Sequence, residues 1–374
     1  MENFAAYLNE GVEIIVRQAL RSALSNPNET AFILKFMAEA KKAADRRLFA
    51  SEGGVHVPPF LIASISSQCN LFCAGCYARA NNSVGESACA TQLTSGDWAR
   101  LFGEARALGV TFILLAGGEP LLRRDVIEAA AGFPEIVFPV FTNGTLFDEA
   151  MVRLFNKKRN LVPMLSLEGD AQQTDTRRGD GVHAALEVAM ARLREMGILF
   201  GASITVTKEN LLRVTDQTYI ERLRESGCKV VVFVEYVPVD ASAATAPDME
   251  DRAVLLARQD RLRCEFDDML LIAFPGDEEA LGGCLAAGRG FFHISPTGDA
   301  EPCPFSPFSD TNLRARPLKD ALTSPLFRKL GLGGLLATEH LGGCALFGRE
   351  DDVRQLLVDE IDSGSPQREP IYLC

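Results

Sequence analysis

The sequence predicts an α/β fold in which strands and helices alternate along most of the chain. Short apolar runs recur from residue 60 to about residue 240, and each is followed by a segment whose apolar residues repeat every three or four positions. Such consecutive strand–helix units imply right-handed crossovers and a parallel sheet. Six strands are too few to close an eight-stranded barrel, so we expect a partial (β/α)6 TIM-like barrel. The predicted strands are 60–66, 110–116, 136–142, 161–167, 200–207 and 229–237.

Helices are expected before and between these strands. Residues 1–57 predict an N-terminal helical extension, because apolar residues from Phe4 to Leu20 follow helical spacing and Pro27 suits the first turn of a second helix. We expect this helical pair to pack on the barrel, whose core is placed at 58–240. The helices between the strands are predicted near 95–108, 123–132, 148–156, 181–196 and 217–226.

The composition changes after Pro238, where small residues and turn formers become frequent. We predict a linker helix and strand over 241–274, a small second domain over 275–345, and a C-terminal helix and tail over 346–374. Within the second domain, residues 290–299 predict a β-hairpin with its turn at Pro296–Asp299.

Charge and hydropathy narrow the range of partners. A net charge of −12 argues against nucleic acid as the main partner, because phosphate binding needs clustered Lys and Arg. No apolar run approaches the length of a membrane span and no signal peptide is visible, so we expect a cytoplasmic protein. Ten cysteines in such a chain indicate metal ligands and free thiols, because cytosolic disulfides are rare.

The most informative stretch follows the first predicted strand. It places Cys69, Cys73 and Cys76 in one loop, separated by three and two residues. Three thiolates on a four-iron cluster leave one iron without a protein ligand, which makes that iron a place for chemistry. A zinc site usually takes four protein ligands in paired short spacings. The residues therefore favour an open iron–sulfur cluster, with structural zinc as the alternative.

This three-cysteine loop resembles the signature of the radical S-adenosylmethionine (SAM) enzymes. Residues 117–120 follow the second strand and resemble that family's glycine-glycine-glutamate-proline element, and residues 142–144 look like the family loop after the third strand, although turn chemistry alone explains them equally well. The resemblance implies a [4Fe-4S] cluster that binds SAM, with Cys69, Cys73 and Cys76 as its ligands and catalytic centre. The residues expected to contact SAM in these two loops are Gly117, Gly118, Glu119, Pro120 and Asn143.

Further cofactor contacts follow from the same resemblance. In similar enzymes polar groups at the end of the fourth strand, here Ser166 and Glu168, meet the ribose and methionyl parts of SAM, although the family commonly has Asp at the second position. Arg178 precedes a glycine, resembles the family's arginine-glycine element and could pair with the cofactor carboxylate. Ser203 and Thr205 on the fifth strand, and the backbone around Tyr236 and Val237, are candidates to frame the ribose and adenine.

Many family members carry an aromatic residue just before the third cysteine, where it can contact adenine. This chain has Gly75 at that position. We expect Tyr77 or Phe72 to compensate, and Tyr77 is the preferred candidate.

The second domain carries another cysteine pattern. Cys284, Gly298 and Cys303 are spaced as in the opening of the auxiliary-cluster modules called SPASM and twitch domains, and Cys344 offers a third thiolate. The resemblance implies one auxiliary iron–sulfur cluster, expected to be [4Fe-4S]. Three alternatives stay open for the fourth coordination position. Cys264 or His293 could fill it, or the iron could stay free to bind substrate.

Together these resemblances imply an oxidoreductase or maturase-type enzyme. It would reductively cleave SAM to a 5′-deoxyadenosyl radical, which abstracts a hydrogen atom from a peptide, protein or small-molecule substrate, with the auxiliary cluster assisting. A ferredoxin or flavodoxin would donate the electron. The alternative is a non-catalytic, cysteine-rich zinc-binding module on an α/β scaffold.

Overall fold

The computed structural model describes residues 2–23, 26–85, 91–238, 243–274, 283–337 and 344–358. Its centre is a single sheet with the strand order β7-β6-β5-β4-β3-β2-β1-β8-β9, in which each neighbouring pair from β1 to β7 is parallel. All six predicted strands are confirmed. They are β1 (Phe60–Ser66), β2 (Phe112–Gly117), β3 (Phe138–Thr142), β4 (Leu161–Leu167), β5 (Gly201–Val206) and β6 (Val230–Glu235).

Helices cover one face of this sheet because alternate strand residues point towards them. Leu61, Ala63 and Ile65 of β1 belong to the main core, together with Trp98 and Phe102 of α4. The helices that follow the strands are α4 (Ser95–Leu108), α5 (Arg124–Ala130), α6 (Glu149–Lys157), α7 (Ala171–Arg178), α8 (Val182–Glu195), α9 (Leu211–Val214) and α10 (Gln217–Glu225). The five predicted helices are therefore present, with ends shifted by a few residues at most.

The segment predicted as a linker helix and strand extends the sheet instead. Helix α11 (Met249–Glu265) starts at Asp248, whose side chain caps it, and leads into β7 (Leu270–Phe274). Strand β7 pairs in parallel with β6 over its whole length. Residues 243–274 thus add a further helix and strand to the barrel. In the sequence, the run of small residues before them resembles a domain boundary.

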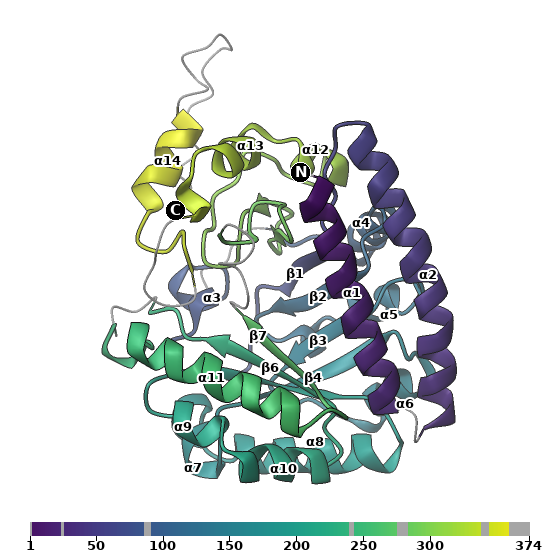
Figure 1. Ribbon diagram of the computed structural model, residues 1–374, viewed down its shortest axis with the longest axis vertical. Coiled ribbons are helices and arrows are strands. Elements are labelled where there is room, and N and C mark those ends of the chain that lie inside the picture. Colours follow the sequence, from purple (N-terminus) through teal and green to yellow (C-terminus); the bar gives the residue numbers. More distant parts are fainter. Residues whose placement is uncertain are drawn as a thin grey trace.

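The N-terminal helical pair is confirmed as α1 (Glu2–Ala23) and α2 (Pro27–Glu52), with Asn26 capping α2 and Pro27 in its first turn. Helices α1 and α2 lie beside each other along the sheet (Figure 1). Their buried residues pack with Phe112, which lies on the sheet face opposite the main core. Val12, Val16, Ile33 and Phe36 bury their side chains there. The pair therefore fills the N-terminal side of the partial barrel, as expected from its apolar stripe.

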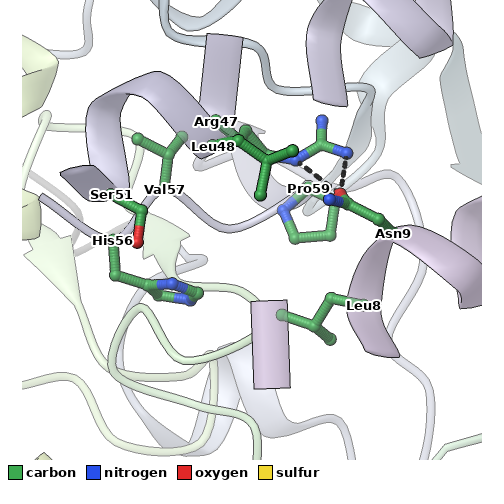
Figure 2. A pocket seen from close by; sticks show the side chains of 8 residues that line it. All are labelled: Leu8, Asn9, Arg47, Leu48, Ser51, His56, Val57 and Pro59. Atoms are coloured by element: carbon green, nitrogen blue, oxygen red, sulfur yellow. Dashed lines mark hydrogen bonds between the residues drawn. The ribbon is translucent and has the colours of Figure 1, made fainter. Parts of the chain in front are cut away.

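A small pocket lies where this helical pair meets the start of β1 (Figure 2). The buried guanidinium of Arg47 donates hydrogen bonds to Asn9, to the Gly109 carbonyl and to Thr111. Burial, together with the charge of Arg46, lowers the pKa of Arg47 to about 10. This pocket is at the N-terminal end of β1, whereas the cysteine loop follows its C-terminal end.

The C-terminal segment joins the sheet at its other edge. Strand β8 (His293–Ile294) pairs in parallel with β1 and antiparallel with β9 (Ala300–Glu301), which confirms the hairpin. The helices that follow are α12 (Leu318–Leu322), α13 (Pro325–Leu332) and α14 (Glu350–Val358), which lie above the sheet in Figure 1. Within the described ranges, no helix is long and apolar enough to cross a membrane.

Candidate functional site

The three cysteines of the first loop lie at the C-terminal end of β1, where parallel sheets gather their chemistry. Cys69, Cys73 and Cys76 are each partly exposed, and Cys76 starts the short helix α3 (Tyr77–Ala80). Burial raises the pKa of Cys69, and negative charge on Glu119, Cys73 and Cys76 adds to the shift. The thiols are thus close enough to repel one another as thiolates. A cationic metal centre would remove that repulsion, so the loop fits a metal cluster.

The loop after β2 approaches the cysteine loop backbone to backbone. A Cβ atom on Gly118 would lie 2.5 Å from the carbonyl carbon of Gln68 and 3.1 Å from Cβ of Cys69, and one on Gly117 would lie 2.6 Å from the Ser66 oxygen. Hydrogen bonds of 2.8 Å join the Gly118 amide to Ser66 and the Glu119 amide to Gln68. The two glycines are therefore needed for this close approach.

The carboxylate of Glu119 is buried and serves the protein's own loops. One oxygen accepts hydrogen bonds from the Thr142 hydroxyl (2.6 Å) and the Leu121 amide (2.9 Å), and the other accepts from the Asn143 amide (2.8 Å). Burial raises the pKa of Glu119, although these hydrogen bonds oppose the shift. Glu119 thus fixes the end of β3 relative to β2.

Asn143 is the next link in this frame. Its amide group donates to the Asn70 side chain (2.9 Å), and Asn70 in turn donates to the Thr145 hydroxyl (2.8 Å). Because Asn70 follows Cys69 directly, this chain ties the cysteine loop to the loop after β3. Asn143 therefore links two loops in addition to forming the turn after β3.

At the end of β4, Glu168 holds both arginines of α7. One carboxylate oxygen accepts from Arg177 and from two nitrogens of Arg178, at 2.8 and 2.6 Å. Arg177 also binds the cysteine loop, because its carbonyl accepts from the Ala74 amide (2.9 Å). Arg178, predicted to pair with the cofactor, is paired here with Glu168. The second oxygen of Glu168 is buried and has no hydrogen-bond partner within the described ranges.

Ser166 and Ser203 lie side by side, since they are register partners on β4 and β5. Both are partly buried. They point to the opposite side from Leu165, Leu167 and Ile204, which belong to the main core under the helices. The structure thus brings these two predicted hydroxyls together on the open side of the sheet, near the end of β4 that carries Glu168.

The aromatic residues around the third cysteine are arranged differently from the expectation. The Tyr77 ring packs against Phe305, with centroids 4.9 Å apart, and Phe72 is 79% exposed on the surface. It is Tyr236, directly after β6, that covers Gly75: a Cβ atom on Gly75 would lie 2.8 Å from its ring. Tyr236 therefore occupies the space beside the third cysteine that neither predicted residue fills.

The second set of cysteines also comes together. Cys284, Cys303 and Cys344 are all buried, although they come from three separate segments. Burial raises the pKa of Cys303, and the neighbouring thiols of Cys344 and Cys284 raise it further. Residues 342–343, which precede Cys344, lie outside the described residues. Three converging thiols without a disulfide fit a thiophilic metal centre.

The two cysteine sets are neighbours through helix α3. Besides the Tyr77–Phe305 contact, the Asn81 side chain donates to the Pro304 carbonyl (2.9 Å). Burial raises the pKa of Tyr77, and negative charge on Cys76, Cys303 and Glu301 contributes. Tyr77 therefore lies within electrostatic reach of both cysteine sets.

His293, one candidate for the fourth auxiliary ligand, is engaged elsewhere. Its Nδ1 lies 2.6 Å from Glu301 and its Nε2 lies 2.7 Å from the Ser64 hydroxyl, and all three residues are buried. This chain joins the C-terminal hairpin to β1. Cys264, another candidate, is exposed on α11. Within the described ranges, no three His, Cys, Asp or Glu side chains close around a single metal ion.

Comparison with known proteins decides the family. Residues 63–216, which run from β1 through the cysteine loop to the segment before α10, match the Radical SAM superfamily. The chain belongs to the radical SAM superfamily. It is a radical SAM enzyme, a class that uses a [4Fe-4S] cluster and SAM. The alternative of a non-catalytic zinc-binding module is therefore wrong.

Relatives extend this radical SAM assignment beyond the matched segment. The chain is 27% identical over 305 residues to an AdoMet-dependent heme synthase of Methanosarcina barkeri, covering 73% of this chain and 84% of the relative. It is 24% identical over 260 residues to a PqqA peptide cyclase of Granulibacter bethesdensis, covering 67% and 68%.

Solved structures share the fold. Streptococcus suis SuiB bound to its precursor peptide SuiA superposes with a TM-score of 0.61 at 18% identity, covering 83% of this chain and 72% of SuiB. The structure of anSMEcpe with bound AdoMet and Cp18Cys peptide gives 0.56 at 17% identity, covering 75% and 83%. At these identities the likeness concerns the fold alone.

Proposed function

We propose that Cys69, Cys73 and Cys76 hold the [4Fe-4S] cluster of this radical SAM enzyme and leave one iron free for SAM. The observation that carries this proposal is the close packing of the cysteine loop on Gly117 and Gly118. This packing leaves no room for a side chain between the two loops, so backbone groups of both can reach one ligand. When bound, the cluster supplies one electron to SAM, which yields methionine and a 5′-deoxyadenosyl radical.

The remaining SAM contacts are assigned to polar groups according to the hydrogen bonds that each already makes within the protein. Backbone groups of residues 117–120 serve the methionyl end, because the Glu119 carboxylate is already fully engaged. The unpartnered oxygen of Glu168 and the hydroxyls of Ser166 and Ser203 are the polar groups that can bind the ribose. Arg178 acts indirectly, since it holds Glu168 in place.

Adenine is assigned to Tyr236. Its ring lies over Gly75, next to the third cysteine, where a flat ligand near the cluster can stack on it. Tyr77, the predicted adenine contact, is assigned instead to the contact between the two cysteine sets. Its packing on Phe305 supports that role.

A second, auxiliary iron–sulfur cluster is assigned to Cys284, Cys303 and Cys344. As thiolates these three buried groups would repel one another, and the irons of a cluster would compensate that negative charge. The Tyr77–Phe305 and Asn81–Pro304 contacts keep this site beside the first one. We infer that it accepts or relays electrons during the substrate reaction.

The names of the relatives indicate which classes of substrate to consider. One curated relative is named as a peptide cyclase and another as a heme synthase, and SuiB was solved with a precursor peptide. We propose hydrogen-atom abstraction from a peptide, protein or small-molecule substrate, with a ferredoxin or flavodoxin as electron donor.

Electron paramagnetic resonance tests the assignment of the ligands. The chain is loaded with iron and sulfide without oxygen, and we expect about seven to eight irons if both clusters form. In a Cys303→Ala variant the remaining reduced cluster should change its spectrum when SAM is added. In a Cys73→Ala variant no spectrum should respond to SAM. An unchanged spectrum on SAM addition in Cys303→Ala, with SAM bound, would overturn the assignment of Cys69, Cys73 and Cys76.

A further inference from the structure

Phe72 is the residue of the cysteine loop to which the proposed function gives no role. It lies between Cys69 and Cys73, and its side chain is 79% exposed. The Arg79 guanidinium lies 3.9 Å from the centre of its ring and also donates to the Leu71 carbonyl (2.6 Å). The ring is thus held on the surface by a cation–π contact instead of folding onto the core.

Single exposed apolar residues are common and need no explanation by themselves. The position of Phe72 distinguishes it from the others, because it immediately precedes one proposed cluster ligand and follows another by three positions. Electron transfer between proteins weakens steeply with distance, so a protein that reduces this site must approach the cysteine loop. Phe72 is the exposed aromatic ring of that loop.

The charge around this loop differs from that of the whole chain. The chain has 50 Asp and Glu residues, yet none lies between Glu52 and Glu86, and Arg79 is the single Lys or Arg in that interval. The nearest hydrogen-bonded loop contributes the neutral Thr145, and the Asp148 that follows it is paired with Arg124 at 2.7 Å. A chain of charge −12 repels an acidic partner in general, and a loop that carries Arg79 and no carboxylate of its own adds nothing to that repulsion.

We propose that Phe72, with Arg79 behind it, is the contact at which a small acidic one-electron carrier protein of the flavodoxin type docks. This inference rests on the proposed function, because it gives the cysteine loop an electron to receive. The carrier's reduced flavin loses one electron, and the site held by Cys69, Cys73 and Cys76 gains it. No atoms are exchanged in the step. The aromatic ring supplies the desolvated centre of the contact and the guanidinium favours the acidic partner.

A binding titration tests the surface without any catalysis. Oxidised flavodoxin is titrated into the iron-loaded enzyme, and its flavin fluorescence anisotropy gives the dissociation constant. We expect Phe72→Glu to weaken binding about tenfold or more, as for an aromatic hot spot. Phe49 of α2 is the matched control, because it is a second phenylalanine with 77% exposure but lies far from the loop in sequence. Phe49→Glu should change binding less than about twofold.

SAM cleavage with two reductants completes the test. With flavodoxin, its reductase and NADPH, Phe72→Ala should form 5′-deoxyadenosine about tenfold more slowly than the wild type. With dithionite, which needs no docking site, the two proteins should be equal. Equal rates with flavodoxin, or equal losses with both reductants, would overturn the docking proposal. A change of oligomeric state in Phe72→Glu with unchanged flavodoxin affinity would assign the surface to a second copy of the chain instead. Failure of the wild type with dithionite would overturn the proposed function itself.

Discussion

Gly118→Ala is the substitution whose effect the structure defines most sharply. The added Cβ atom would lie 2.5 Å from the Gln68 carbonyl carbon and 3.1 Å from Cβ of Cys69. Carbon atoms in favourable contact are about 3.5–4.0 Å apart, so the two loops would have to separate by about 1 Å. The obstacle is backbone, which cannot rotate away as a side chain would.

The cost can be worked out from two contributions. Separation would break the 2.8 Å hydrogen bond from the Glu119 amide to Gln68, which contributes about 1 kcal/mol. Overpacking adds about 1–3 kcal/mol. The sum of about 2–4 kcal/mol would fall on the loop that carries Cys69, so we expect loss of the first cluster more than loss of the fold.

Iron content and SAM cleavage are the assays for this variant. Gly118→Ala should lose about half of its iron and at least 90% of its 5′-deoxyadenosine formation, since each 1.4 kcal/mol is roughly a factor of ten. Gly103→Ala is the matched control, because its nearest neighbour is the Phe133 ring at 3.8 Å and alanine favours helix α4. Wild-type iron content and cleavage in Gly118→Ala would refute the close-approach reasoning.

Four further substitutions test other parts of the account. Glu119→Gln should cost about 1–3 kcal/mol in thermal unfolding, because its NH2 group would face an N–H donor such as that of Asn143; unchanged stability would show that this frame is unimportant. Cys303→Ala should lose the iron of one cluster but keep SAM cleavage, whereas Cys73→Ala should lose cleavage. Iron content and 5′-deoxyadenosine are measured for both variants, and cleavage that is lost in Cys303→Ala but kept in Cys73→Ala would contradict the assignment. His56 lines the pocket of Figure 2, and burial lowers its pKa. Because the unfolded chain then binds a proton more readily than the folded protein does, stability should fall as pH drops below about 6.5. His56→Gln should flatten the dependence of Tm on pH between about pH 7 and pH 5, and an unchanged slope there would contradict this origin.

The strands and most helices could be predicted because their signal is local. The short apolar runs of β1 to β6 and the capping residues of α2 and α4 lie within a few positions of each element. Strand β7 was also predicted as a strand, but its place in the sheet was not, because the small residues before α11 resemble a linker. The pairing of β8 with β1 rests on two register pairs between residues about 230 positions apart, which leave no periodic pattern.

The candidate site divides in the same way. The cysteines and Gly117–Gly118 carry recognisable spacing, so the sequence indicates them directly. The backbone around Tyr236 was predicted to frame the cofactor, but the contact of its ring with Gly75 was not, because that contact joins residues far apart in the chain. Arg178 resembled a ligand contact because spacing cannot show that Glu168, ten residues earlier, already holds its guanidinium.

The most direct test of the central claim is formation of 5′-deoxyadenosine. The chain is loaded with iron and sulfide without oxygen, incubated with SAM and dithionite, and compared with Cys73→Ala and with a known radical SAM enzyme treated in parallel. The account predicts 5′-deoxyadenosine and methionine in equal amounts from the wild type and neither from Cys73→Ala. A fully iron-loaded wild type that forms no 5′-deoxyadenosine, while the known enzyme does, would contradict it.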